Sequence, residues 1–112
     1  MSAELDAEDA KLVTLARATR ARTRAAEGAA VRDSEGRTYA ACTVDLGTLR
    51  LTALQLAVAM ALSSGVKGLE AAAVVTDALD SVDVNVVRHF AGAAIPVVVA
   101  NGTGEVRHVV HT

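Results

Sequence analysis

The sequence predicts an α/β protein, a three-layer α-β-α sandwich with a mixed sheet. The predicted elements follow the order α-β-β-α-β-α-β-β, which combines a hairpin with a later crossover through a helix. Two short, continuous apolar runs are typical of central strands buried on both faces. The 112 residues include 24 Ala and 17 Val, small side chains that let helices pack closely on a sheet. This length predicts one domain over residues 1–112, with residues 1–8 frayed.

Composition excludes several classes of partner. The net charge of −2 gives no global field that would attract nucleic acid or an anionic membrane. The longest nearly uncharged apolar stretch, residues 51–62, is too short to cross a bilayer, which takes roughly 20 residues. Cys42 is the single cysteine, and the N-terminus is acidic where a secretory signal would be basic and then apolar. We therefore expect a cytoplasmic protein with neither a membrane nor a nucleic-acid partner.

The first element is an amphipathic helix over residues 7–27. Leu12, Leu15 and Ala16 recur at helical spacing, and acidic residues precede basic ones along the helix, as its dipole prefers. The basic residues are Lys11, Arg17, Arg20, Arg22 and Arg24. At 100° per residue Arg22 falls on a different side from Arg17, Arg20 and Arg24. We interpret these side chains as a solvated face rather than a stripe that contacts phosphates.

A β-hairpin and a second helix follow. Strands over residues 28–33 and 37–45 are joined by a turn that ends at Gly36, a residue able to take a positive φ. The helix over residues 51–64 ends before Gly65 and is apolar on nearly every side. Such a helix needs neighbours on several faces. This pattern favours a homo-oligomer, a dimer or tetramer, whose interface includes the helix.

The remaining elements alternate in type. Residues 69–76 and 95–100 are the two continuous apolar runs and predict buried strands. The segment between them, residues 82–91, has the length of a short helix. A turn over residues 101–104 then leads to a last strand over residues 105–111.

The middle of the chain is similar to a known family. The run Glu27–Val31, a turn ending at Glu35-Gly36, the segment Tyr39–Asp45 and the helix start at Leu51–Ala53 resemble the short, homotetrameric cytidine deaminases. Those proteins have a V-G-A-A-L strand, a D-G turn, a Y-x-G-x-N-x-E-N segment and a T-x-C-A-E-R helix start at the same spacing. Their A-V-V-A-D strand resembles Ala73–Asp77. The resemblance covers residues 27–106 and keeps one ungapped register over residues 39–59.

The resemblance implies a zinc site whose chemistry this chain does not retain. The family needs Zn²⁺ held by thiolates, or by one His and two Cys, and a Glu that moves a proton. In this register the first ligand is Leu54 and the proton-shuttling Glu is Leu56. The P-C-x-x-C pattern places the other two ligands at Val84 and Val87. The resemblance therefore implies a degenerate member with no catalytic residues, no metal and no cofactor, in which these four side chains fill the core. The alternative is that they are ordinary core positions of an unrelated α/β protein.

The positions that would bind a nucleoside are partly retained. The ribose-binding Asn and Glu of the family fall on Thr43 and Asp45, which are shorter but still able to form hydrogen bonds. The base-stacking Phe becomes Ala25. The resemblance thus leaves Thr43 and Asp45 as candidate ligand-binding residues, while a plain strand-end pair is the structural alternative.

These observations favour a non-catalytic, oligomeric scaffold or regulatory subunit with a protein partner. One alternative is a nucleoside or nucleotide sensor that uses Thr43 and Asp45. A second is a residual cytidine deaminase whose site is completed across a subunit interface. A third is a metal-free or relocated enzyme, which would need an ionisable group in a pocket. The candidates for that group are Asp45, Asp77, Asp83 and His89.

Overall fold

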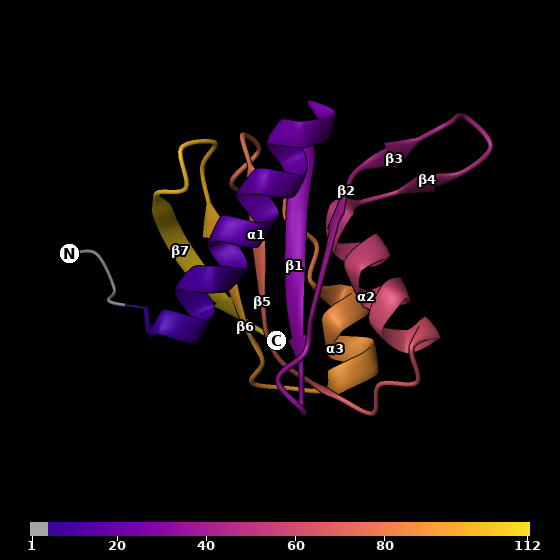
Figure 1. The fold of residues 1–112 in the computed structure, drawn as a ribbon, viewed down its shortest axis with the longest axis vertical. Helices are drawn as coiled ribbons and strands as arrows, with labels where there is room; N and C mark the ends of the chain where they lie inside the picture. Colours follow the sequence, from indigo (N-terminus) through magenta and orange to yellow (C-terminus); the bar gives the residue numbers. More distant parts are fainter. Residues whose placement is uncertain (1–4) are drawn as a thin grey trace.

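A computed structural model describes residues 5–112 and shows a sheet covered by helices on both faces. Helix α1 lies on one face, and α2 and α3 lie on the other (Figure 1). The α/β class and the three layers predicted from the sequence are confirmed. Across the part of the chain that the structure describes, no helix is long and apolar enough to span a membrane.

The elements follow the predicted order, with one small hairpin added. The helices are α1 (Ala7–Thr23), α2 (Ala53–Ser63) and α3 (Asn85–Ala91). The strands are β1 (Glu27–Asp33), β2 (Thr38–Cys42), β3 (Val44–Asp45), β4 (Arg50–Leu51), β5 (Leu69–Thr76), β6 (Pro96–Ala100) and β7 (Val106–His111).

The main sheet is mixed, with the strand order β2-β1-β5-β6-β7. Strands β5 and β6 run parallel, because α3 carries the chain back across the face of the sheet between them. The other neighbours in this sheet are antiparallel. Strands β3 and β4 pair only with each other and form a hairpin that projects away from the main sheet (Figure 1).

Side chains of the central strands alternate between the two faces of the sheet. Ala30, Ala73 and Val75 pack in the cluster under α1, whereas Ala29 and Val74 pack in the cluster under α2 and α3. All five are buried. Both layers are therefore built from small side chains, as the composition predicts.

Helix α1 approaches the sheet most closely at Gly28. A Cβ atom on Gly28 would lie 2.0 Å from the backbone carbonyl oxygen of Ala16 and 2.9 Å from Cβ of Arg20. Real Cβ atoms do not come that near to backbone oxygen, so only glycine fits here. The absence of a side chain on Gly28 sets the depth at which α1 packs on β1.

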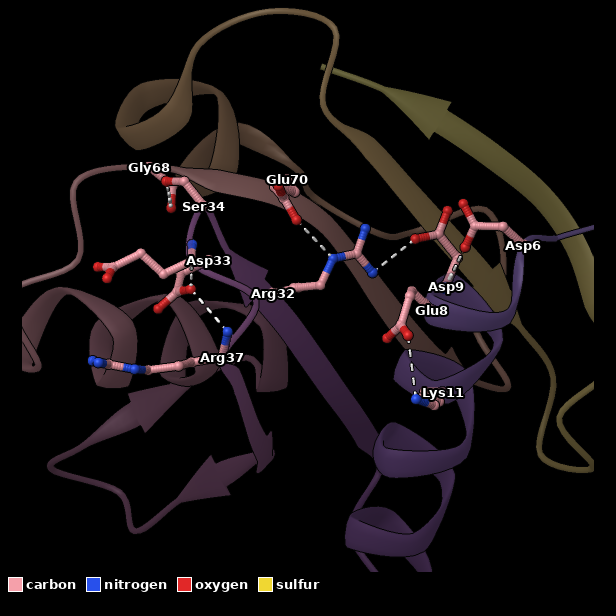
Figure 2. Close-up of polar contacts among 11 residues, drawn as sticks. Asp6, Glu8, Asp9, Lys11, Arg32, Asp33, Ser34, Arg37, Gly68 and Glu70 are labelled. Atoms are coloured by element: carbon pink, nitrogen blue, oxygen red, sulfur yellow. Dashed lines mark hydrogen bonds and ion pairs between the residues drawn. The ribbon is translucent and has the colours of Figure 1, made fainter.

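An ion-pair network joins the start of α1 to the sheet (Figure 2). Nη1 of Arg32 on β1 lies 2.9 Å from Oδ1 of Asp9, and its Nε lies 2.9 Å from Oε1 of Glu70 on β5. Burial opposes the charge of Arg32, yet its hydrogen bond to the Glu70 carboxylate and the negative charge of the adjacent Asp9 raise its pKa above the usual value. The network holds α1 against β1 and β5.

A buried carboxylate organises the turn between β1 and β2. Oδ1 of Asp33 accepts hydrogen bonds from the backbone N–H groups of Glu35 (2.8 Å) and Arg37 (2.9 Å; Figure 2), and Oδ2 accepts one from the Tyr39 hydroxyl at 3.0 Å. Burial favours the neutral acid, but these hydrogen bonds and the Arg37 charge outweigh it and lower the pKa of Asp33. Gly36 completes the turn with a φ of 85°.

Several predicted boundaries are wrong by a few residues. The first helix ends at Thr23 rather than at residue 27, because Arg24 takes a left-handed conformation with a φ of 54°. The strand predicted over residues 37–45 breaks at Thr43. In the segment predicted to fray, residues 1–8, Ala7 and Glu8 lie in α1 after an N-cap at Asp6, and residues 1–4 lie outside the described part of the chain.

Candidate functional site

The starts of α2 and α3 lie close together beside one end of the sheet. A small cavity of about 40 Å³ opens there, lined by residues from β1, β5, the start of α2 and the segment before α3. Its walls include Glu27, Thr52, Leu54, Val74 and Asp83. This is the region in which the sequence predicted the degenerate metal site.

The structure brings the predicted positions together in one apolar cluster. The side chains of Leu54, Val84 and Val87 are 2%, 7% and 0% exposed, and all three belong to the cluster under α2 and α3. Leu56 is half-buried and packs against the same cluster. These positions are therefore filled with hydrocarbon.

A capping box begins α2 and fixes the direction of its first side chains. Oγ1 of Thr52 accepts a hydrogen bond from the backbone N–H of Gln55 at 3.0 Å, and Oε1 of Gln55 accepts one from the Thr52 N–H at 2.9 Å. The side chain of Gln55, which makes this hydrogen bond, is exposed, while the side chain of Leu54 lies on the buried side of the helix. The cap thus places Leu54 in the core.

The N-cap residue of helix α3 is Val84, whose side chain has no oxygen to cap the helix. The neighbouring Asp83 accepts a hydrogen bond from the N–H of Asn85, the first residue of the helix, at 2.9 Å. One turn along, Val87 is fully buried. The buried side chains of Val84 and Val87 therefore pack this helix against the sheet.

The residues present do not fit a zinc ion. Zinc requires thiolate, imidazole or carboxylate ligands, and Leu54, Val84 and Val87 carry no lone pair. Within residues 5–112 no group of three or more His, Cys, Asp or Glu side chains is placed to hold a metal. Cys42, on β2, is a half-buried free thiol.

Thr43 and Asp45, the residues that the resemblance leaves as candidates for nucleoside binding, line one pocket. The pocket has a volume of about 250 Å³, and Arg50, Thr52 and Gln55 also line it. The Thr43 hydroxyl accepts a hydrogen bond from the Glu27 N–H at 2.9 Å and donates one to the Glu27 carbonyl at 3.3 Å. Asp45 is exposed and pairs with Arg50 at 3.2 Å across the β3–β4 hairpin. Both side chains thus already have intramolecular partners.

A larger groove between α2 and α3 was not predicted. It has a volume of about 540 Å³, and its walls include Gln55 and Leu62 of α2 and Val86, His89 and Phe90 of α3. The sequence feature that could have indicated this groove is the apolar outer surface of α2, which was interpreted as part of an oligomer interface. Asp83 and His89 both line this groove.

The ionisable groups considered for a relocated enzyme do not form one site. Asp45 lines the smaller pocket on the other side of Thr52 and Gln55. Asp77 lies outside both pockets and pairs with Arg20 of α1 at 2.7 Å. Asp83 and His89 therefore line the same groove, whereas Asp45 and Asp77 lie outside it.

Comparisons with known proteins agree with this fold. The family model described as cytidine deaminase-like matches residues 5–104. The 1.6 Å crystal structure of a cytidine deaminase from Burkholderia pseudomallei superposes with a TM-score of 0.75 at 25% sequence identity, covering 90% of each chain. No curated protein matches the chain in sequence. Because the family model spans most of its length, this chain belongs to the cytidine deaminase-like family.

Proposed function

We propose that this chain is a non-catalytic cytidine deaminase-like protein that acts in the cytoplasm as an oligomeric scaffold or regulatory subunit. The observation that carries the proposal is the burial of Leu54, Val84 and Val87 in one apolar cluster at the starts of α2 and α3. The family's reaction needs a metal to lower the pKa of a bound water and a Glu to move its proton. Leu56 cannot move a proton, and hydrocarbon cannot bind the metal.

Exposed apolar side chains support the oligomeric part of this proposal. Met60 and Leu62 on α2 are 39% and 49% exposed, and Leu46 and Leu49 are exposed at the tip of the β3–β4 hairpin. Exposed large apolar side chains are a feature of protein–protein interfaces, and here they lie on α2 and on the neighbouring hairpin. A dimer or tetramer that covers α2 would bury this surface, and a protein partner could use the rest of it.

The assignment of the lost ligands is tested by restoring them. In a Leu54→Cys/Val84→Cys/Val87→Cys variant, we expect uptake of about one Co²⁺ per chain with a thiolate charge-transfer band, because the three sulfur atoms would share one site. The matched control is Leu12→Cys/Val75→Cys/Val98→Cys, which changes one buried Leu and two buried Val in the cluster under α1. A folded restored variant that takes up no more Co²⁺ than the control would contradict the assignment.

The loss of catalysis is tested directly by turnover. Wild-type protein incubated with cytidine, deoxycytidine or cytosine should release no ammonia above a buffer blank. Deaminase activity that follows the protein through successive purification steps would contradict the proposal. Coexpression with a catalytically complete deaminase tests whether a site is completed across a subunit interface, in which case mixed oligomers would gain activity.

A second candidate function is the sensing of a nucleoside or nucleotide. It is favoured by the pocket of about 250 Å³ that Thr43 and Asp45 line together. Under this alternative, one member of a nucleoside panel at about 1 mM should raise the melting temperature of the wild type but not of Asp45→Asn. The absence of a thermal shift with every nucleoside of the panel would contradict this second candidate function.

A further inference from the structure

The end of α1 and the turn between β6 and β7 enclose a hollow on the face of the sheet opposite α2 and α3. Its volume is about 420 Å³. It is lined by Arg17, Arg20, Ala21, Arg24, Ala25 and Gly102. The sequence predicts a solvated face for these arginines, whereas three of them line one concave surface in the structure.

Arg20 is held in a defined position at this hollow. Its side chain is 18% exposed, and its Nη2 donates to Oδ2 of Asp77 at 2.7 Å. Its Nε donates to the carbonyl oxygen of Ala25 at 3.2 Å. The bonds to Asp77 and Ala25 limit the rotamers of Arg20, so little further side-chain entropy would be lost when a ligand binds.

The positive charge at the hollow is only partly compensated. Asp77 balances Arg20, but among residues 5–112 no carboxylate forms an ion pair with Arg17 or Arg24. The helix dipole favours cations anywhere in the last turn of α1, Arg22 included, and does not require a shared hollow. In a chain of net charge −2, this local excess of positive charge creates a surface suited to an anion.

Glycines in the β6–β7 turn make room for the guanidinium groups. A Cβ on Gly102 would lie 3.0 Å from Nη1 of Arg20, and one on Gly104 would lie 3.3 Å from Cδ of Arg17. Larger residues at these positions would push the arginines away from the turn. Ala21 and Ala25 also line the hollow, so its uncharged lining residues have small side chains and its charged lining residues are all arginines.

We propose that this hollow binds the phosphate groups of a small ligand that carries a diphosphate. Planar guanidinium groups form paired hydrogen bonds with phosphate oxygens, and Arg17 and Arg24 are available to do so on either side of Arg20. The site lies on the opposite face of the sheet from the cavity at Leu54, and it requires neither a metal nor catalysis. It would allow the protein to respond to a phosphorylated metabolite.

Inorganic pyrophosphate is the probe, titrated by calorimetry into the wild-type protein at constant ionic strength. We expect Arg17→Gln and Arg24→Gln each to weaken binding about tenfold or more, because each removes a charge-assisted contact. Arg22→Gln is the matched control, since Arg22 lies on the same helix, carries the same charge and does not line the hollow. Its affinity should stay within about twofold of the wild type.

Gly102→Val supplies a variant of unchanged charge that narrows the hollow, and it should also weaken binding. The proposal is overturned if the wild type shows no pyrophosphate binding at about 1 mM, or if Arg22→Gln loses as much affinity as Arg17→Gln. It is equally overturned if sulfate at the same ionic strength binds as tightly as pyrophosphate, or if the arginines bind single-stranded RNA but not pyrophosphate.

Discussion

Gly28 is the residue at which the packing of α1 depends on the absence of a single atom. We expect Gly28→Ala to destabilise the protein by about 2 kcal/mol or more, because its methyl group would overlap the Ala16 carbonyl oxygen, 2.0 Å away. Gly68→Ala is the control: its Cβ would meet only Oγ of Ser34 at 3.3 Å, and the cost should stay below about 1 kcal/mol. Urea unfolding measures both, and equal costs would refute the close approach of α1.

Asp33 makes stability depend on pH in the acid range. Its pKa in the folded protein lies below the ordinary value of 3.8, so the folded state binds this proton more weakly than the unfolded state. The stabilisation from ionised Asp33 is complete above about pH 4 to 5 and is lost as the pH falls through the lowered folded pKa. Stability should therefore decline on acidification.

The measurement compares urea midpoints of the wild type and Asp33→Asn between neutral pH and the acid limit. The wild type should be more stable at pH 7, and the difference should shrink as the acid form replaces the carboxylate in the wild type. Asp45→Asn, at an exposed aspartate, should follow the wild-type profile. A gap between wild type and Asp33→Asn that does not change with pH would show that the carboxylate is not the source of stability.

At the residue scale, the burial of the candidate positions was more predictable than the contacts of the polar side chains. That Leu54, Val84 and Val87 lie buried in one cluster followed from the resemblance and from their aliphatic character. The partner of Asp45 did not, because the sequence had no signal that Arg50 would face it across a hairpin. The gathering of arginines around Gly102 was also missed, since a helical wheel shows only the helix and not the turn beside it.

At the element scale the ion pairs of Arg32 fix where α1 begins on the sheet. We expect Arg32→Ala to cost about 2 to 4 kcal/mol, because it leaves Asp9 partly buried without its counter-charge. Arg50→Ala breaks the Asp45–Arg50 pair, in which both side chains are well exposed, and should cost less than about 1 kcal/mol. Chemical denaturation measures the free energy of unfolding of both variants. A loss of stability in Arg32→Ala as small as that in Arg50→Ala would show that the network does not stabilise α1.

The β3–β4 hairpin is the element that the sequence does not predict. Strand β2 ends at Cys42, and Thr43 still bonds through its N–H and its hydroxyl to the backbone of Glu27, the first residue of β1. The chain then leaves the main sheet at Val44. Gly47 then takes a φ of 91° between Leu46 and Leu49, whose backbone N–H and C=O groups close the turn at 3.0 Å. A glycine followed by threonine between apolar residues is the available hairpin signal. Strands of two residues are too short to show alternation, so the periodicity of the sequence could not predict them.

Helix ends show why the boundaries were less predictable than the elements. The start of α2 carries a capping box of Thr52 and Gln55, and Gly65 follows its end with a φ of 85°. The end of α1 has no such signal, because Arg24 occupies the left-handed position that glycine usually fills. The periodicity of α1 therefore predicted a helix that continues to residue 27.

At the scale of the whole molecule, the exposed surface of α2 predicts association. We expect Met60→Lys/Leu62→Lys to convert an oligomer into a monomer, because the charges would have to be buried in the interface. Leu15→Lys is the control, since Leu15 is exposed on α1, on the opposite face of the sheet. Sedimentation velocity measures the outcome. A wild type that is already monomeric, or an oligomer that persists in the double variant, would contradict an interface through α2.

The central claim concerns the molecule as a whole: the cytidine deaminase-like fold is retained while hydrocarbon fills the positions that would hold a metal. The most direct test is the zinc content per chain of untagged wild-type protein purified without chelator, measured by elemental analysis. Zinc far below one atom per chain is the predicted result, because Leu54, Val84 and Val87 offer no ligand atoms. One zinc atom per chain, retained through gel filtration, would contradict the account and would mean that a different set of residues forms the site.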